Sequence, residues 1–396
     1  MTSEDIIRIE DLYYARVYAK RKQVLVRGAG AELFDPEGRR YIDLTSGYGV
    51  AILGYGHPKI IEAIQQQAER LVTCHGSFYN DARASFLEKL VRAAPKGLDD
   101  VIMTNSGAEA IEAALKTAMR ATGRTEIIAF VRAYHGKTFG ALSATWEQKY
   151  KDGLGPLLTN FTHVPYGDIE KTRAAVSDRT AAILVEPIQG EGGVRVPPKG
   201  FLKALSELTK EKGLLLVLDE VQTGLMRTGK MFGFQWESVV PDILVLGKGL
   251  AGGLPVGAVL SNKETLLKLG LGGHTSTMAG SPLVSAAGSA TLDALREEIG
   301  ESDVARRSSL FFELLGKCTG FKVLRELRGK GLMMGLELRL EAEAVLNSLS
   351  SSGVLALPAG RNVVRLLPPL VISEPLIREA CEKLRVALEV ENSKLG

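Results

Sequence analysis

Short apolar runs alternate with longer amphipathic stretches through the middle of the chain. The apolar runs, rich in β-branched residues, span 100–105, 126–131, 181–188, 214–221, 242–248 and 256–262. Such runs are typical of buried strands. Between them, residues 107–123 and 200–213 repeat apolar positions with the period of a helix. Strands without a polar face need cover on both sides, so the pattern predicts an α/β fold with a mostly parallel central sheet between helices.

The two ends of the chain show a different pattern. Residues 30–43 are expected to form a small hairpin that turns at Asp35-Pro36-Glu37-Gly38. After residue 282 a long helix is followed by mixed strands and helices. We expect a large central domain and a smaller α+β domain to which both termini contribute. The expected boundaries are 1–49 for the N-terminal part of the small domain, 50–281 for the large domain and 282–396 for the C-terminal part of the small domain.

Length and composition narrow the class of protein. A chain of 396 residues with 45% hydrophobic and 24% charged residues can bury a large core. Its formal charge of +3 gives no support to a nucleic-acid-binding stripe or a polybasic membrane patch. Cys74, Cys318 and Cys381 lack the spacing of a disulfide framework or a zinc site. The acidic start has no apolar core like that of a signal peptide, and no apolar run reaches the ~20 residues of a membrane span, so we expect a cytoplasmic protein.

Polar side chains gather where the predicted strands end. In open α/β sheets, ligands bind at the carboxyl ends of the strands. Those ends carry Ser106-Gly107, Tyr134-His135-Gly136, Glu186, Asp219-Glu220 and Lys248. Each has an ordinary structural explanation by itself, but their common position predicts a ligand site along one rim of the sheet.

The stretch NSGAEAIEAALK, residues 105–116, indicates an anion site at this rim. A strand ends, Ser106 and Gly107 turn the chain, and a helix begins. The free backbone N–H groups and the positive end of the helix dipole favour an anion such as phosphate. The alternative is a plain helix cap, in which Ser106 and Glu109 form a capping box.

Asp219 follows a run of apolar residues and therefore needs a partner that carries a proton or a positive charge. The nitrogen of a pyridine ring fits, because an aspartate keeps it protonated and makes the ring an electron sink. A divalent metal ion is a second candidate, although no G-x-x-x-x-G-K-[ST] loop lies upstream. A purely structural carboxylate, paired with backbone donors, is the third.

Lys248 ends the apolar run 242–248 and lies between Gly247 and Gly249. A lysine in a poorly solvated pocket loses its proton easily and becomes a nucleophile toward aldehydes. The alternative is a lysine that extends from a strand end into solvent. Beside Asp219 and an anion site, Lys248 completes the set of groups that pyridoxal phosphate requires: an aldehyde partner, a ring-nitrogen partner and a phosphate cradle.

Motifs along nearly the whole chain resemble those of the class III aminotransferases, of the ornithine, acetylornithine and 4-aminobutyrate type. These motifs are LFDPEGRRYIDL, NSGAEA, AYHGKT, EPIQGEGG, LDEVQTGLMRTG, GKGLAGGLPVGAV, HTSTMAGSP and VVRLLPPL. The resemblance implies PLP fold type I, the aspartate aminotransferase-like fold, with pyridoxal 5′-phosphate as cofactor. It also implies a homodimer with shared active sites.

The resemblance assigns cofactor contacts to individual residues. Lys248 would bond covalently to the cofactor aldehyde, and Asp219 would pair with the ring nitrogen as the second catalytic residue. Tyr134 and Val221 would lie on opposite faces of the ring, with Gln222 at its phenolic oxygen. The full expected set is Ser106, Gly107, Ala108, Tyr134, Asp219, Val221, Gln222, Lys248 and Thr277, of which Thr277 would reach the phosphate in the other subunit.

The same resemblance implies that Lys137, Glu191, Ser276 and Arg365 bind the substrate. Glu191 and Arg365 would form a switch in which the glutamate neutralises the arginine until a substrate carboxylate needs it. Many relatives have H-G-R-T where this chain has His135-Gly136-Lys137-Thr138. A lysine keeps the charge of that arginine but loses its two-pronged hydrogen bond.

The expected activity is transfer of an amino group between glutamate and a terminal semialdehyde. Segments 46–58, 142–150 and 353–372 resemble the branch of lysine and arginine biosynthesis that uses the amino-group carrier protein LysW. The expected substrates are therefore [LysW]-aminoadipate semialdehyde, [LysW]-glutamate semialdehyde or both. N-acetylornithine, ornithine and 4-aminobutyrate are the alternatives, and a pyridoxal-phosphate racemase or aminomutase is a more distant one.

Overall fold

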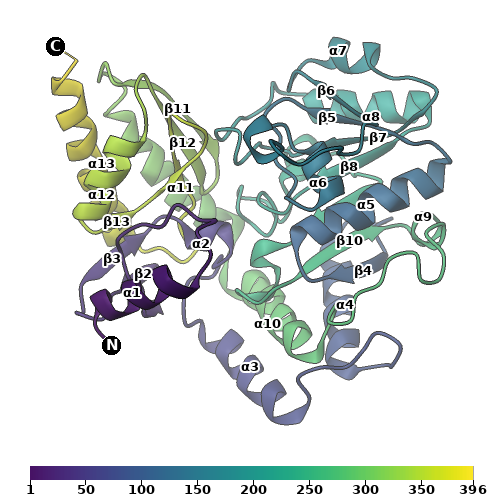
Figure 1. Cartoon of the computed structure of the whole chain (residues 1–396), viewed down its shortest axis with the longest axis horizontal. Coiled ribbons are helices and arrows are strands. Elements are labelled where there is room, and N and C mark those ends of the chain that lie inside the picture. The colour runs from purple at the N-terminus through teal and green to yellow at the C-terminus, as the bar shows by residue number, and fades with distance from the viewer. Residues whose placement is uncertain (396) are drawn as a thin grey trace.

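A computed structural model describes residues 1–395 of the chain, and its centre is a seven-stranded sheet in the order β4-β10-β9-β8-β7-β5-β6 (Figure 1). The strands are β4 (Asp100–Thr104), β5 (Glu126–Phe130), β6 (Phe161–Val164), β7 (Thr180–Val185), β8 (Leu215–Asp219), β9 (Ile243–Leu246) and β10 (Gly257–Ser261). All neighbours pair in parallel except β10, which is antiparallel to both β4 and β9. The prediction of a mostly parallel α/β sheet is confirmed.

Helices cover both faces of this sheet, because its strands bury alternate residues on opposite sides. Leu216 and Leu218 of β8 belong to the apolar cluster that includes α8 (Phe201–Lys212). Val217, between them, belongs to the cluster that includes α5 (Gly107–Thr122). Further helices of this part are α3 (Pro58–Arg70), α4 (Asp81–Ala93), α6 (Phe139–Ala144), α7 (Ile169–Ala174), α9 (Lys263–Leu267) and α10 (Pro282–Glu298), with 3-10 turns η1 (Gln148–Tyr150), η2 (Gly233–Glu237) and η3 (Lys248–Ala251).

The two ends of the chain lie side by side in two small sheets (Figure 1). Strand β13 from the C-terminal part pairs in parallel with β3 of the N-terminal hairpin. The first sheet contains β1 (Arg27–Ala29), β2 (Glu32–Phe34), β3 (Arg40–Asp43) and β13 (Val354–Leu355); the second contains β11 (Leu324–Lys330), β12 (Met333–Leu338), β15 (Val363–Leu366) and β14 (Leu357–Pro358). The associated helices are α1 (Ser3–Tyr13), α2 (Ser46–Gly49), α11 (Glu301–Gly316), α12 (Glu343–Ser351) and α13 (Glu374–Ser393).

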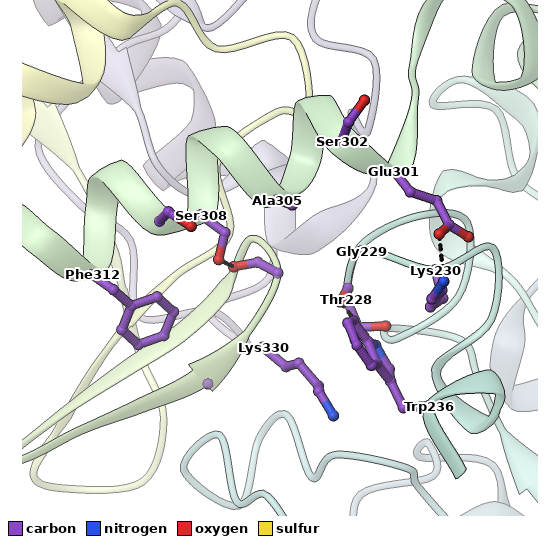
Figure 2. A pocket seen from close by; sticks show the side chains of 13 residues that line it. Thr228, Gly229, Lys230, Trp236, Glu301, Ser302, Ala305, Ser308, Phe312 and Lys330 are labelled. Carbon is purple, nitrogen blue, oxygen red and sulfur yellow. Dashed lines mark hydrogen bonds and ion pairs between the residues drawn. The ribbon is translucent and has the colours of Figure 1, made fainter. Parts of the chain in front are cut away.

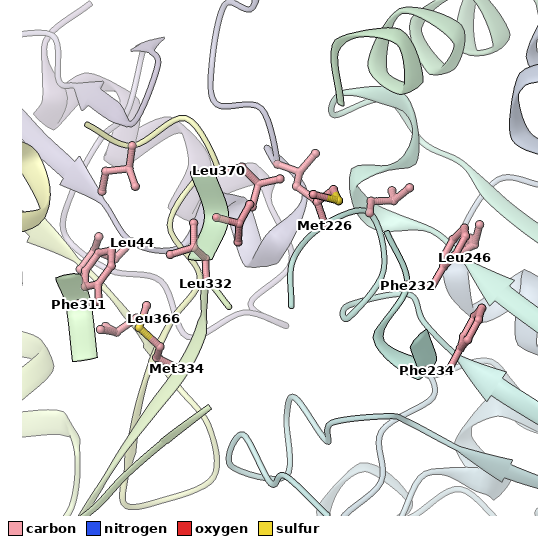
Figure 3. Packing of buried hydrophobic residues seen from close by; sticks show 14 of the residues in the cluster. Leu44, Met226, Phe232, Phe234, Leu246, Phe311, Leu332, Met334, Leu366 and Leu370 are labelled. Carbon is pink, nitrogen blue, oxygen red and sulfur yellow. The ribbon is translucent and has the colours of Figure 1, made fainter. Parts of the chain in front are cut away.

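One apolar core joins the central sheet to the small sheets. Figure 3 shows Phe232 and Leu246 on the side of the central sheet and Phe311 and Leu366 on the other side. Met226 lies between them, in the loop that follows β8. The loop after β8 therefore contacts both halves, and it also carries several of the predicted site residues.

No helix among the described residues combines the length and the apolar character that crossing a bilayer requires.

Candidate active site

A cavity of about 330 Å³ lies at the carboxyl ends of β5, β7, β8 and β9. It is lined by Gly107, Ala108, Tyr134, His135, Gly136, Lys137, Glu186, Glu191, Asp219, Val221, Gln222 and Lys248. The structure thus brings together most of the residues that the sequence singled out, from segments that are as much as 141 positions apart (248 − 107). The parallel strand order explains this convergence, because the carboxyl ends of neighbouring parallel strands meet at one edge.

Lys248 reaches the cavity from a tight turn directly after β9. Its φ of 44° lies in the left-handed region, which a residue with a side chain adopts at a cost of roughly 1–3 kcal/mol. Gly247 permits the turn, since a Cβ there would lie 3.2 Å from the Cα of Gly107. Burial lowers the pKa of Lys248 below its ordinary value. A lysine with a lowered pKa supplies the neutral amine that attacks an aldehyde.

Asp219, the last residue of β8, is fixed by two protein donors. Its Oδ2 lies 2.7 Å from Nδ1 of His135, and its Oδ1 accepts a hydrogen bond of 3.0 Å from the backbone N–H of Val221. Both side chains are buried. The backbone N–H of His135 donates to Oγ1 of Thr145 at 2.9 Å, which holds the histidine in place. The carboxylate is therefore presented to the cavity in one orientation.

A second buried carboxylate, Glu186, holds another part of the cavity wall. Glu186 accepts hydrogen bonds from the backbone N–H groups of Tyr134 at 3.1 Å and Gly190 at 3.0 Å. Burial raises the pKa of Glu186 to about 7. Burial, assisted by the nearby charge of Glu191, also raises the pKa of Tyr134 to about 12. Tyr134 therefore keeps its phenolic proton at neutral pH and offers a neutral ring to the cavity.

The first turn of α5 forms the anion-binding end of the cavity. Oγ of Ser106 caps the helix by accepting a hydrogen bond of 3.1 Å from the backbone N–H of Glu109. The side chain of Glu109 returns to the backbone N–H of Asn105 at 2.7 Å. The expected reciprocal capping box is thus displaced by one residue. Since the first N–H groups of a helix have no partner within it, Gly107 and Ala108 can donate to an anion.

Arg365, on β15, contacts two of the residues that line the cavity. Its side chain is fully buried and pairs with Glu191 at 2.6 Å. It also donates a hydrogen bond of 3.0 Å to Oε1 of Gln222. With its oxygen engaged in this way, Gln222 has its amide N–H groups available for an acceptor in the cavity. The ion pair that the sequence suggested is formed in this structure.

Lys137 lies at the mouth of the cavity and is exposed. Its ammonium group lies 4.5 Å from the centre of the Tyr150 ring, and that of Lys149 lies 5.0 Å from the same ring. The edge of Tyr150 packs against Tyr134 with 6.0 Å between ring centres. Lys137 and Tyr134 line the cavity, and Tyr150 and Lys149 lie beside them, so two cations and two aromatic rings are close together near the opening.

Four predicted residues are not among those that line the cavity: Ser106, Ser276, Thr277 and Arg365. Ser106 caps α5 beside the cavity, and Arg365 is bonded to two residues of its wall. Thr277 is exposed on the loop before α10. Ser276, beside it, accepts a hydrogen bond of 2.6 Å from Nδ2 of Asn105 and so lies near the start of α5. The family resemblance expects Thr277 to act in the other subunit of a dimer, and a single chain gives no test of that role.

Two residues that complete the site, His135 and Glu186, had no predicted role. Both follow strand ends on the rim that carries Asp219, so their position was a usable signal. The partners of these two residues could not be predicted. Their contacts join groups more than 50 positions apart, and such contacts do not follow from the spacing of residues along the chain.

The cavity of about 330 Å³ is the candidate active site because of the side chains that line it, and not because of its size. A larger one of about 530 Å³ lies where the loop after β8 meets α11 and the turn between β11 and β12 (Figure 2). There Lys230 pairs with Glu301, and Lys330 lies 4.1 Å from the Trp236 ring centre. None of the predicted site residues lines it.

The groups in the smaller cavity fit pyridoxal phosphate. Lys248 offers an amine for its aldehyde, Asp219 a carboxylate for its ring nitrogen, and the first turn of α5 free N–H groups for its phosphate. A Cβ at Gly107 would lie 2.8 Å from Cγ1 of Val221, so any larger residue would press against the cavity wall. Within the described residues, no three His, Cys, Asp or Glu side chains are arranged to hold a metal ion.

Comparisons with known proteins agree with this chemistry. The sequence model of the class-III aminotransferases matches residues 13–388. The chain is 43% identical to an acetylornithine aminotransferase from Methanopyrus kandleri, over 97% of this chain and 99% of the relative. It is 44% identical to a [LysW]-aminoadipate semialdehyde transaminase from Deinococcus radiodurans, over 93% and 86%. A crystallised ornithine aminotransferase from Toxoplasma gondii, with partial occupancy of PLP at its active site, superposes with a TM-score of 0.95 at 33% identity over 99% and 96%.

Proposed function

Because the chain belongs to the class III aminotransferases, which are pyridoxal-phosphate enzymes, we propose that it moves an amino group between glutamate and a carrier-bound terminal semialdehyde. The proposed acceptors are [LysW]-aminoadipate semialdehyde, [LysW]-glutamate semialdehyde or both. The chain is 43% identical to an acetylornithine aminotransferase, 44% to a [LysW]-aminoadipate semialdehyde transaminase and 42% to an ornithine aminotransferase. These identities are too similar to decide between the substrates. The proposal therefore rests on the site.

The ion pair of Arg365 with Glu191 is the observation that carries the proposal. Glutamate brings two carboxylates to the cavity, whereas a terminal amine brings none near its reacting carbon. A buried arginine without a counter-charge is costly, so Arg365 needs a carboxylate in both half-reactions. Glu191, whose side chain is partly exposed, can supply it for the amine and leave when glutamate supplies its own.

The chain's own residues account for the proton transfers. Pyridoxal phosphate, when bound, supplies an aldehyde that accepts the amino group and a ring that withdraws electrons from the amino-bearing carbon. Asp219, held by His135, would keep a proton on the ring nitrogen. Lys248 Nζ, with its lowered pKa, would take the proton from the amino-bearing carbon and return it in the reverse direction. Tyr134 and Val221 would pack against the two faces of the ring and so fix its position.

The mouth of the cavity supports a carrier-bound substrate. Lys137 and Lys149 flank Tyr150 at the opening. A basic and aromatic rim complements an acidic chain end and speeds its approach. Of the three segments that resemble the carrier-dependent branch, segment 142–150 contributes Lys149 and Tyr150 to this rim.

Single-turnover absorbance spectra of the cofactor test the substrate. The cofactor-loaded enzyme is mixed in turn with glutamate, carrier-linked lysine, N-acetylornithine, ornithine and 4-aminobutyrate. The proposal expects the fastest conversion with glutamate and the carrier-linked amine, and slowing of the latter as salt rises. Faster conversion with N-acetylornithine would identify the acetylornithine activity instead. Conversion of L-glutamate to D-glutamate without 2-oxoglutarate would indicate a racemase.

We also propose a homodimer whose partner completes each site. Large apolar side chains are exposed on two segments: Phe78 and Tyr79 on one, Leu271 and Met278 on the other. Arg83 joins these segments, because its guanidinium donates to the carbonyls of Cys74 and Gly280. Exposed apolar side chains on neighbouring segments favour a protein partner. Thr277, which is exposed next to Met278, would serve the second copy of the chain.

A further inference from the structure

The loop that carries Glu191 lies across the sheet that carries Arg365. Strand pairing places Arg328 of β11 opposite Gly335 of β12, and Gly335 opposite Arg365 of β15. These three residues form one row across the sheet. The loop after β7 contacts all three residues, so the loop runs along this row.

At one end of the row, Arg328 forms hydrogen bonds with the backbone of the loop. Its guanidinium donates to the carbonyl of Gly193 at 3.1 and 2.6 Å and to the carbonyl of Val194 at 3.0 Å. Arg328 is buried, and its charge is balanced by the buried Glu337 at 2.5 Å. A planar guanidinium can bind two adjacent carbonyls at once, which a single ammonium group cannot do.

At the middle of the row, the loop is strained. Val194 has a φ of 51° although it is β-branched and fully buried. Such a backbone persists only where its surroundings hold it. Gly335 makes the close approach possible, because a Cβ there would lie 2.9 Å from Cβ of Val194.

At the other end of the row, Glu191 pairs with Arg365. The loop is also tied to the central sheet, because the backbone N–H of Gly190 donates to Glu186. The backbone on both sides of Glu191 is therefore fixed, at Gly190 and at Gly193. With its backbone fixed, Glu191 can leave Arg365 only by rotating its own side chain.

We propose that Arg328 is a positioning residue that clamps the loop after β7 and so keeps Glu191 within reach of Arg365. This inference rests on the Glu191–Arg365 switch of the proposed function. It names the residue that sets the equilibrium between the closed and the open ion pair. A loosened loop weakens the internal ion pair, and a carboxylate ligand then competes with Glu191 for Arg365 more easily. Loss of the clamp should therefore increase the affinity for a dicarboxylate.

Glutarate, an unreactive dicarboxylate, measures this effect by calorimetry on the cofactor-loaded enzyme. Arg328→Lys keeps the charge beside Glu337 and removes the two-carbonyl grip; Arg328→Gln removes both. In both variants we expect glutarate to bind about 3- to 10-fold more tightly than in the wild type. Arg195 and Arg325 still pair with Glu337 at 3.1 and 3.2 Å, so the buried carboxylate keeps counter-charges in either variant.

Arg325→Gln is the matched control. Arg325 is exposed and pairs with the same Glu337, and within the described residues it has no hydrogen bond to the loop. This variant should bind glutarate as the wild type does. General damage to the fold would weaken glutarate binding, so the predicted increase separates positioning from a merely structural role.

Glu191→Gln separates failure of the inference from failure of the switch. It removes the internal competitor and should bind glutarate at least as tightly as the Arg328 variants. If Glu191→Gln binds glutarate no more tightly than the wild type, the switch is refuted, and the positioning role of Arg328 is refuted with it. If Glu191→Gln shows the increase while both Arg328 variants match or fall below the wild type, only the clamp is overturned.

Discussion

Asp219 is held in one orientation by protein groups, because His135 and the N–H of Val221 contact its two oxygens. The histidine is itself buried, and its Nε2 has no hydrogen-bond partner within the described residues. Burial of that unpaired atom is unfavourable, which is a reason to expect that His135 is retained for its contact with Asp219.

Replacing His135 should therefore slow the reaction without changing substrate affinity. Loss of a hydrogen bond to a buried carboxylate costs about 1.5–3 kcal/mol, or roughly 10- to 100-fold in rate if the carboxylate acts in the transition state. We expect His135→Phe to lower kcat by that factor with little change in KM for glutamate. Steady-state kinetics measure this effect. His135→Asn, which can still donate to Asp219, should recover most of the rate, and equal losses in the two variants would contradict the positioning role.

At the residue scale, the sequence could predict side chains whose chemistry is unusual for their position. Lys248 and Asp219 follow apolar strands, so their cost of burial marks both positions, and their combination with an anion site at the same rim predicts the ligand. Glu191 and Arg365 came only from the resemblance, because nothing local marks an ion pair between positions 174 apart (365 − 191). The sequence places His135 at the rim but does not predict its role, because nothing in the spacing indicates its contact with Asp219.

At the scale of elements, the junction between β8 and η2 depends on one buried carboxylate. Glu220 accepts hydrogen bonds from the backbone N–H groups of Gly233 at 2.9 Å and Phe234 at 2.8 Å. It also accepts one from the hydroxyl of Thr223 at 2.6 Å. Unlike Asp219, its neighbour, Glu220 does not line the cavity, so it holds the loop that follows the site.

Glu220 should make stability depend on pH. Burial raises its pKa from 4.5 to about 7, so between these pH values the unfolded chain releases a proton that the folded chain keeps. Its contribution to stability is therefore complete below about pH 4.5 and falls by about 3 kcal/mol as pH rises through 7. Urea unfolding of the wild type and Glu220→Gln at pH 5 and pH 8 measures it. The variant should gain relative to the wild type at pH 8, and a constant difference would contradict the raised pKa.

The start of α5 gives a second prediction at this scale. A methyl group at Gly107 would meet the Val221 side chain at 2.8 Å, so Gly107→Ala should shift the cavity wall and weaken cofactor binding by about 10-fold or more. Equilibrium titration of the apoenzyme with pyridoxal phosphate measures the affinity. Gly316→Ala is the control, because a Cβ at Gly316, the last residue of α11, has no atom within 4 Å. Unchanged affinity in Gly107→Ala would contradict the assignment of the phosphate to this helix.

Elements with continuous apolar runs were predictable, and those without them were not. Strand β8 and its neighbours were expected within a few residues of their bounds, since a buried parallel strand has no polar face. Strand β6 was not expected, because its sequence FTHV is short and partly polar, as suits an edge position. The reversed direction of β10 was not predictable either, because its apolar run resembles that of its parallel neighbours.

At the scale of the whole molecule, the C-terminal part of the chain returns to the central sheet and contacts the cavity wall. Arg365 enters from β15 near the C-terminus, while Lys248 and Asp219 come from the central sheet. The shared apolar core shown in Figure 3 keeps these parts in register. If the proposed dimer forms, a third contribution comes from the partner copy.

Mixed dimers test that contribution. Thr277→Val should impair both sites of a homodimer, and Lys248→Ala should abolish both. When the two variants are co-expressed, each mixed dimer contains one intact site, so activity should recover to about one quarter of the wild type after random pairing. Lys248→Ala with Asp219→Ala is the control, because both residues belong to one chain's cavity and no intact site can form. Failure of the first pair to recover would contradict a role for Thr277 in the partner's site.

A covalent bond between Lys248 and the cofactor aldehyde is the central prediction for this site. Borohydride reduction of the cofactor-loaded enzyme makes such a bond permanent, and peptide mass spectrometry then locates it. We expect the added mass of the reduced cofactor on the peptide that contains Lys248, and on no other lysine. A label on a different lysine, or an active enzyme with no label on Lys248, would refute this assignment.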